Sequence, residues 1–221
     1  MRGLIEDATA EEVLAVAVER HHPNLVLACS FQKEESVLID MLLRIEPGAR
    51  VFTIDTGVLF PETYETREKL IARYPIQFER ILPELTLEEQ AAKHGERLWE
   101  RDPDACCGIR KVAPLKLVLD DSDAWITGIR REQSTTRESA RKIELDERRG
   151  VVKIQPLADW TSRDVWRYIW RHGIPYNLLH DHGYPSIGCI PCTTPVDGNA
   201  PDERAGRWRG TGKVECGLHG N

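Results

Sequence analysis

Residues 24–45, NLVLACSFQKEESVLIDMLLRI, have the pattern of a strand, a polar loop and a helix. The run NLVLACS (24–30) is short and apolar, as expected of a buried strand. The segment EESVLIDMLLRI (34–45) has one apolar helical face, made of Val37, Leu38, Met41, Leu42 and Ile45. A loop of this kind aims backbone N–H groups and the positive end of a helix at an anion. It lacks the glycines of a Walker loop, and an ordinary strand-to-helix connection is the simpler explanation of the loop taken alone.

The same alternation continues along the chain. Further strands are predicted at 49–55, 76–82 and 123–129. Helices between them are indicated by start and stop signals. These signals are Thr9 with Glu12 for residues 10–21, Pro61 for residues 61–74, and Thr86 with Gly95 for the segment between them; a further helix is predicted at 111–119. Strands that alternate with helices predict an α/β fold with a mostly parallel sheet flanked by helices.

The C-terminal third has a different pattern. Residues 142–157 predict a hairpin with its turn near Gly150, and a helix follows between Thr161 or Ser162 and Gly173. From residue 176 onward Gly, Pro, Cys, His and Arg dominate, which predicts an irregular layer. We therefore expect one domain over residues 1–221, in which residues 202–221 form a C-terminal tail.

Composition narrows the class of protein. Hydrophobic residues make up 41% of the chain and charged residues 30%, which indicates a packed core rather than disorder. A net charge of −6 argues against nucleic-acid or membrane partners. Two basic clusters, at 130–142 and 202–213, nevertheless suggest a small anionic ligand, with solvated faces as the alternative. The opening MRGLIEDATAEE has no apolar signal-peptide core, so we expect a cytoplasmic location.

In a reducing compartment the six cysteines are expected to act as ligands or catalysts. Cys106 and Cys107 are adjacent, and Cys189 and Cys192 form a C-x-x-C pair. Four thiolates suit zinc or an iron–sulfur cluster. Adjacent cysteines reach two irons of a cluster more easily than two corners around one zinc ion, so we favour a 4Fe–4S cluster. A disulfide between the adjacent pair, or four unligated thiols, are the alternatives.

Three further residues near or outside this set carry chemistry. Lys111 follows Cys107 by one helical turn, where it would stabilise a thiolate cluster and bridge to a substrate anion, unless it is a surface lysine. Cys29 lies in an apolar strand and is expected in the core. Cys216 lies in the terminal segment VECGLHGN with almost nothing apolar to pack. Nearby Lys213 and Arg209 would lower its pKa, which predicts a nucleophile on a mobile arm; an incidental cysteine is the alternative.

Seven motifs together resemble the assimilatory adenylyl-sulfate (APS) reductases of the phosphoadenylyl-sulfate reductase family. They are SFQKEES (30–36), IDTG (54–57), CCGIRK (106–111), TGIRREQS (127–134), GCIPCT (188–193), ERAGRW (203–208) and ECGLH (215–219). The resemblance covers nearly the whole chain and implies the adenine nucleotide alpha-hydrolase-like fold.

The resemblance also implies a two-step reaction. Cys216 would attack the sulfonyl sulfur of adenosine 5′-phosphosulfate, so that AMP leaves and a cysteine S-sulfonate remains. Thioredoxin or a similar dithiol protein would then release sulfite. Such a tail must close for the first step and open for the second.

A set of substrate-binding residues follows from the same resemblance. Ser30 and Phe31 would approach the nucleotide phosphate, and Gly128 would line the nucleotide site. The adenosine side would be formed by Asp55, Thr56 and Gly57. Phosphate and sulfate oxygens would be held by Lys111, Arg137, Arg204 and Arg207, with His219 over the substrate.

One departure from the family is visible. Relatives often have glycine in the first loop, where this chain has FQKEE. Lys33 would add a phosphate contact there, whereas Glu34 and Glu35 would repel a 3′-phosphate. The cluster cysteines imply APS as substrate, with the 3′-phosphorylated nucleotide PAPS, or both, as the alternative.

Two hypotheses of other classes stay open, and so does assembly into a homo-oligomer. A tRNA sulfurtransferase would share the sheet, although its usual SGGxDS loop is absent. A zinc-stabilised nucleotide-binding module would leave Cys216 without a function.

Overall fold

The computed structural model describes residues 5–198, 200 and 202–219. The first four residues of the N-terminal stretch and the last two of the tail lie outside the described residues. The described residues form a six-stranded sheet in the order β3-β2-β1-β4-β6-β5. Its strands are β1 (Leu25–Ala28), β2 (Arg50–Ile54), β3 (Phe78–Ile81), β4 (Ala124–Ile126), β5 (Ile143–Asp146) and β6 (Val151–Ile154). All neighbours pair in parallel except β5 and β6, which form the predicted hairpin. The prediction of an α/β fold with a mostly parallel sheet is confirmed.

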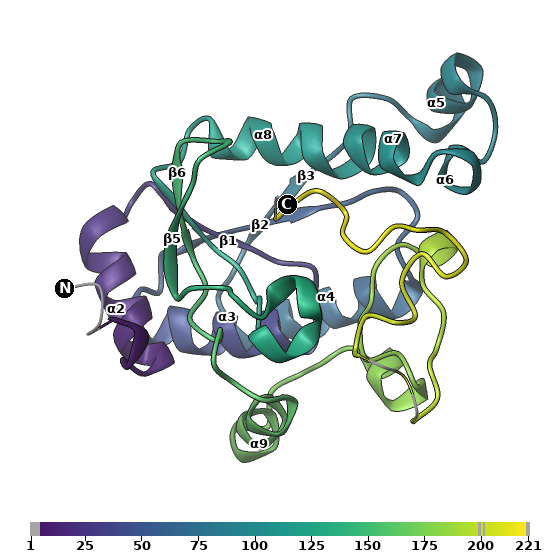
Figure 1. The fold of residues 1–221 in the computed structure, drawn as a ribbon. Helices are drawn as coiled ribbons and strands as arrows, with labels where there is room; N and C mark the ends of the chain where they lie inside the picture. Colours follow the sequence, from purple (N-terminus) through teal and green to yellow (C-terminus); the bar gives the residue numbers. More distant parts are fainter. Residues whose placement is uncertain (1–4, 199, 201, 220–221) are drawn as a thin grey trace.

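Helices cover both faces of this sheet (Figure 1). On one face lie α2 (Ala10–His21), α3 (Lys33–Ile45), α4 (Pro61–Arg73) and α9 (Ser162–His172). On the other lie α5 (Leu87–His94), α6 (Leu98–Arg101), α7 (Pro103–Cys107) and α8 (Ala113–Leu119). A π-helical turn, Gly108–Val112, joins α7 to α8. Each face has its own hydrophobic core, the larger one beneath α2, α3 and α9.

The predicted helix signals operate as expected. Thr9 and Glu12 form a capping box at α2, and Thr86 and Glu89 form another at α5. At α9 the cap is Thr161, and the helix ends at Gly173 with a φ of 59°, a left-handed conformation that glycine adopts without strain. The short helices α6 and α7 were not predicted, because four or five residues are too few to show a helical period.

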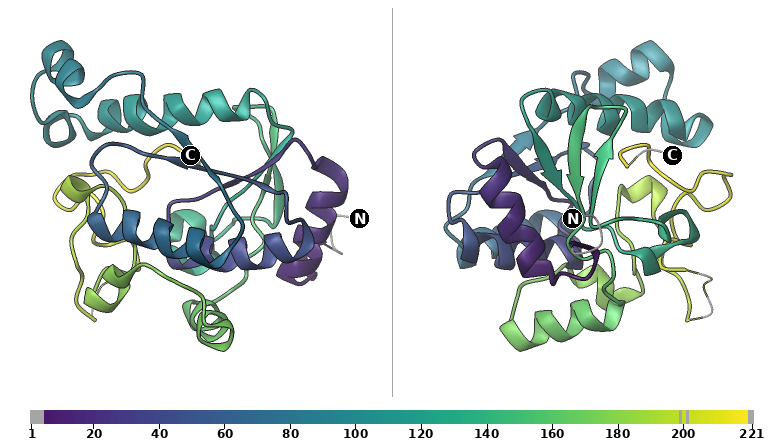
Figure 2. Two further views of the ribbon diagram at one scale, coloured as in Figure 1. Left: turned by 180° about the vertical axis from the view of Figure 1, so that it is seen from behind. Right: turned by 60° about the vertical axis from the view of Figure 1, so that its left-hand side comes forward.

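The order of the strands creates a switch point between β1 and β4. From β1 the chain moves outward to β2 and β3, and it then returns to the other side of β1 to form β4. Open α/β sheets bind ligands outside the carboxyl ends of their strands at such a point. The segment after α9 lies away from α2 in both views of Figure 2 and closes this end of the sheet. None of the described helices is long and apolar enough to cross a membrane.

Candidate active site

A cavity lies at the switch point. Its walls come from the loops that follow β1, β2 and β4, and from the C-terminal tail. Ten of the residues predicted for the site line it together: Ser30, Phe31, Thr56, Lys111, Gly128, Arg137, Arg204, Arg207, Cys216 and His219. These residues are spread over 190 positions of the chain, from Ser30 to His219. The fold therefore gathers residues from six separate motifs, together with Arg137, which lies outside them.

Two predicted residues, Asp55 and Gly57, are not among those that line the cavity. The buried carboxylate of Asp55 accepts hydrogen bonds from the Gly57 N–H at 2.9 Å and from the Tyr64 hydroxyl at 2.8 Å, and it pairs with Arg80 at 2.7 Å. These contacts fix the backbone on both sides of Thr56, which does line the cavity.

The first turn of α3, directly after the loop that follows β1, presents a buried carboxyl to the cavity. Glu35 Oε2 accepts hydrogen bonds from Ser30 Oγ and from the Gln32 N–H, both at 3.1 Å. Burial, and then the neighbouring Glu34, raise the pKa of Glu35 to about 7. A Cβ on Gly128 would lie 2.5 Å from Glu35 Oε1, so only glycine allows the loop after β4 to approach this closely.

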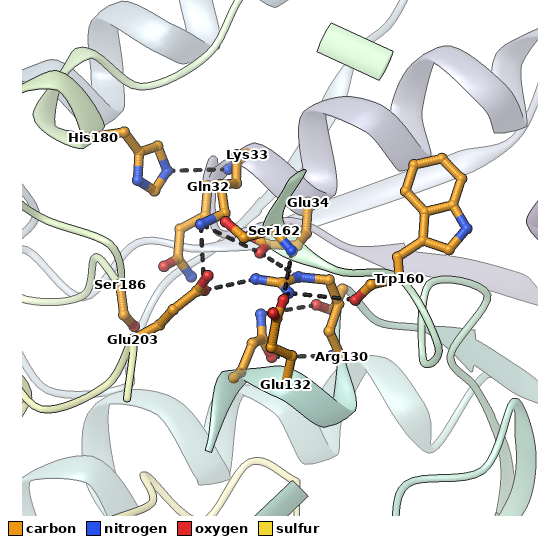
Figure 3. Close-up of polar contacts among 12 residues, drawn as sticks. Gln32, Lys33, Glu34, Arg130, Glu132, Trp160, Ser162, His180, Ser186 and Glu203 are labelled. Carbon is orange, nitrogen blue, oxygen red and sulfur yellow. Dashed lines mark hydrogen bonds and ion pairs between the residues drawn. The ribbon is translucent and has the colours of Figure 1, made fainter. Parts of the chain in front are cut away.

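Lys33 and Glu34 do not face the cavity, which corrects the roles expected for them. Lys33 Nζ lies 3.2 Å from Glu203 Oε2, and both Lys33 and Glu34 are buried. Arg130 has no exposed surface; its guanidinium contacts Glu34 at 2.9 Å, Glu203 at 2.6 Å and Glu132 at 3.0 Å (Figure 3). Burial raises the pKa of Glu34, but Lys33 and Arg130 outweigh burial and hold that pKa below its usual range.

This charge network ties three distant segments together. Glu203 belongs to the tail, Lys33 and Glu34 to the start of α3, and Arg130 to the loop after β4. The sequence showed the charges but gave no signal for the pairing, because partners up to 170 residues apart meet only in the folded chain.

The tail is packed against the protein and Cys216 is buried, in contact with Cys107 and Trp208. Burial raises the pKa of the Cys216 thiol. Lys111, a hydrogen bond from the Leu218 N–H, Arg207 and Arg204 outweigh burial, so the net pKa is lowered. These cations replace the sequence neighbours expected for this role, since the ammonium group of Lys213 instead pairs with Asp104.

Glu215, the residue before Cys216, accepts hydrogen bonds from two of the arginines predicted to bind anions. Arg137 donates two hydrogen bonds to its carboxylate, at 2.9 and 3.1 Å, and Arg204 donates one at 2.9 Å. Glu215 was not predicted as a site residue, although its place beside Cys216 in the ECGLH motif was a usable signal. Arg137 therefore binds the carboxylate with the fork geometry typical of oxyanion sites, and Arg204 adds a single contact.

Several buried polar atoms at the cavity have no hydrogen-bond partner. They are Thr127 Oγ1, Trp125 Nε1, Arg204 Nε, Arg207 Nε and His219 Nδ1. Buried polar groups are normally paired, so a set of unpaired groups around one cavity indicates a polar ligand. The His219 ring stacks on Trp125 with 5.5 Å between centroids, and burial followed by Arg137 and Lys153 lowers its pKa far below the usual range.

The four predicted cluster cysteines line a second, smaller cavity with Trp208. Cys106 and Cys107 come from α7, while Cys189 and Cys192 come from the loop around residue 190. Burial raises the pKa of Cys107 to about 12 and that of Cys192 to about 11, so these thiols need a bound cation to ionise.

The atoms that line this second cavity indicate which kind of metal group it could hold. No set of three or more His, Cys, Asp or Glu side chains among the described residues is arranged to hold a metal ion. Four thiols around one cavity, with the buried Trp208 Nε1 lacking a partner, fit a group that carries sulfur acceptors. Lys111 lines both cavities and is therefore placed between the cysteines and the larger site.

Comparisons with known proteins agree with this geometry. A family model described as the phosphoadenosine phosphosulfate reductase domain matches residues 24–195. The adenosine 5′-phosphosulfate reductase of Geobacillus thermodenitrificans (strain NG80-2) is 50% identical over 97% of this chain and 91% of its own length. The phosphoadenosine 5′-phosphosulfate reductase of Gloeobacter violaceus is 49% identical over 97% of this chain and 90% of its own. The crystal structure of the phosphoadenylyl-sulfate (PAPS) reductase of Candida auris in its phosphate complex has a TM-score of 0.76 at 34% identity, covering 85% of this chain and 91% of that one.

Proposed function

The chain belongs to the phosphoadenosine phosphosulfate reductase family, and from this premise we propose that it reduces adenosine 5′-phosphosulfate to sulfite and AMP. The enzyme is then an oxidoreductase acting on a sulfur group, as expected from the sequence. The observation that carries the proposal is the position of Cys216, whose thiol has a lowered pKa and lines the same cavity as Lys111, Arg204 and Arg207.

In the first step the Cys216 thiolate attacks the sulfur of the sulfuryl group. A bond forms between the two sulfur atoms, the bond from sulfur to the phosphate oxygen breaks, and AMP leaves with that electron pair. Lys111, Arg204 and Arg207 would balance the charge of the approaching thiolate and of the leaving phosphate. Arg137 would hold a sulfate or phosphate oxygen when Glu215 moves away from it.

In the second step a dithiol protein such as thioredoxin supplies two electrons. One of its thiolates attacks the Cys216 sulfur and displaces sulfite, and its second thiol resolves the mixed disulfide and restores the Cys216 thiolate. Because Cys216 is buried, the tail must open before a protein can reach it. The proposed location is the cytoplasm, where such dithiols are kept reduced.

Cys106, Cys107, Cys189 and Cys192 would hold a 4Fe–4S cluster. When bound, the cluster would supply a fixed charge beside Lys111 and would hold α7 and the loop around residue 190 together. Zinc is the alternative occupant, and metal analysis for iron and acid-labile sulfide after anaerobic purification separates the two.

Substrate choice between APS and PAPS is part of the proposal. The two relatives above differ by one percentage point in identity and carry the two different names, so identity alone does not decide. APS is favoured because the first loop brings the Glu35 carboxyl, rather than a cation, to the cavity. Near neutral pH this group carries partial negative charge that would oppose a 3′-phosphate.

The decisive experiment is an anaerobic assay of sulfite release from APS and from PAPS with thioredoxin. We expect turnover with APS and, without thioredoxin, a mass gain of one SO3 group on the peptide that contains Cys216. An adduct on another cysteine, or turnover that survives Cys216→Ser, would contradict the mechanism. Equal turnover of PAPS would make the enzyme one of dual specificity.

A further inference from the structure

The tail is attached to the rest of the protein in two different ways. Up to Trp208 the attachment uses backbone hydrogen bonds. Thr193 and Arg207 form a β-bridge, and the Trp208 N–H donates to the Cys192 carbonyl at 2.9 Å. Between Arg209 and His219, the described residues make no backbone-to-backbone hydrogen bond to any residue before Trp208. The position of the last eleven described residues therefore depends on side chains.

Two of these side chains come from the β5–β6 hairpin. Arg149 Nη2 donates to the Gly217 carbonyl, and Lys153 Nζ donates to the His219 carbonyl, both at 3.3 Å. Both are oriented by hairpin carboxylates. Asp146 contacts Arg149 at 2.6 Å, and Glu144 contacts Lys153 at 3.3 Å.

The hairpin cations and the tail also share an aromatic platform. Both Arg149 and Lys153 lie over the Trp125 ring, each 6.0 Å from its centroid, and His219 stacks on the same indole. Cations beside an indole face gain from its quadrupole. The platform therefore fixes the two donors and the end of the tail in one arrangement.

Neither cation lines the substrate cavity, in contrast to Arg137, Arg204 and Arg207. Arg149 and Lys153 reach the two residues on either side of Leu218, directly after Cys216. A loss of these donors would free the cysteine end of the tail without removing any group that faces the nucleotide.

We propose that Arg149 and Lys153 are positioning residues that hold the tail closed over the cavity during sulfur transfer. The inference rests on the proposed function, in which the tail is closed for the first step and open for the second. The two donors would speed the first step, because they stabilise the closed tail and do not line the cavity. Their loss would not slow the second step, which needs the tail open.

The test separates the two steps. Single-turnover formation of the Cys216 S-sulfonate is followed by mass spectrometry with saturating APS and no reductant. We expect the rate to fall about threefold in Arg149→Ala or Lys153→Met and about tenfold in the double variant, as for the loss of charge-assisted hydrogen bonds. Reduction of the preformed adduct by thioredoxin is expected to proceed at least as fast as in the wild type, and the Kd for AMP to stay within about twofold.

A matched control removes two positive charges elsewhere. Lys69 on α4 and Lys93 on α5 are exposed, so Lys69→Ala with Lys93→Ala changes the net charge equally and leaves the tail contacts intact. Arg149→Lys keeps a cation and is expected to restore part of the rate. Amide hydrogen exchange of residues 209–219 is expected to accelerate in the double variant and not in the control.

The outcomes are distinct. A wild-type protein that forms no adduct defeats the proposed function itself. An adduct that forms equally fast in the wild type and in the double variant, with unchanged exchange in the tail, overturns the positioning role. A loss of AMP affinity that parallels the loss of rate also overturns it, since the hairpin would then be shaping the nucleotide cavity.

Discussion

Cys29 and Cys216 are both buried and both line the same cavity, yet their thiols have opposite properties. Burial, and then the nearby Glu35, raise the pKa of Cys29 well above its usual value. At Cys216 burial acts in the same direction, but Lys111, Arg207 and Arg204 outweigh it and lower the pKa. The difference shows that neighbouring charge, rather than exposure, separates the pKa values of these two buried thiols. It also gives the cavity an acidic end at the loop after β1 and a cationic end beneath the tail.

The largest expected effect is the contrast between the two cysteines themselves. Cys216→Ser should reduce sulfite release by about ten-thousandfold or more, because it removes the nucleophile. Cys29→Ala should change kcat by less than about twofold and cost roughly 1 kcal/mol of stability for the lost packing. Sulfite release by both variants is measured anaerobically with thioredoxin, and an inactive but folded Cys29→Ala protein would break the comparison.

The second effect tests the cation that contributes most to the low pKa. Lys111→Ala should slow adduct formation on Cys216 by about a thousandfold, because it removes a charge that faces the thiolate and, in the proposed mechanism, would face the leaving phosphate. Lys116→Ala is the control, since its ammonium is exposed on α8 and pairs with Asp120. Single-turnover rates decide: a similar loss in both variants would point to a general effect of net charge.

The third effect concerns Lys33 and Arg130, two buried cations whose charges are already balanced by carboxylates. Glu203→Gln leaves Lys33 and Arg130 with one carboxylate fewer in a buried network, and it should lower the free energy of unfolding by about 3 kcal/mol. Glu132→Gln, at the half-exposed edge of the network, should cost less than about 1 kcal/mol. The free energy of unfolding of both proteins is measured with denaturant. Equal decreases in the two variants would mean that burial does not determine how much these ion pairs stabilise the fold.

The smallest effect is a pH dependence at the acidic end of the cavity. The folded-state pKa of Glu35 is about 7, above the ordinary 4.5, so between these values the unfolded chain releases a proton that the folded protein retains. Stability is therefore lost as pH rises through this window, by about 2 kcal/mol between pH 5 and pH 7. Glu35→Gln should remove that part of the pH dependence. If the free energy of unfolding falls equally with rising pH in both proteins, Glu35 is ionised like an exposed acid.

Much of the fold followed from local signals in the chain. Hydrophobic period, capping residues such as Thr9 and Thr86, and the proline at 61 placed the strands and the long helices. The parallel order then brought the polar residues after β1, β2 and β4 to one edge. Ser30, Thr56 and Gly128 meet there because they lie shortly after strands that the sequence had already indicated. Lys111, Arg137 and the tail residues reach the same edge from segments that follow no strand directly.

The pairing of charges was not predictable in the same way. Glu203 with Arg130, and Glu215 with Arg137, are 73 and 78 residues apart, and no periodic pattern reports such contacts. The sequence predicted a mobile tail that closes and opens, and the structure has the last part of this tail docked through side chains. Composition alone predicted few apolar contacts, and it could not reveal that hairpin cations would hold the backbone carbonyls.

The burial of Cys216 in the docked tail has a consequence for chemical survival. A thiolate with a low pKa is the form that peroxides and alkylating agents attack. In the docked state the Cys216 side chain is buried, so a reagent that does not enter the cavity reaches the sulfur only when the tail lifts. The rate at which iodoacetamide labels Cys216 would then report how often the tail opens, and bound nucleotide would lower that rate. The contacts that aim the sulfur at its substrate would in this way also preserve it between turnovers.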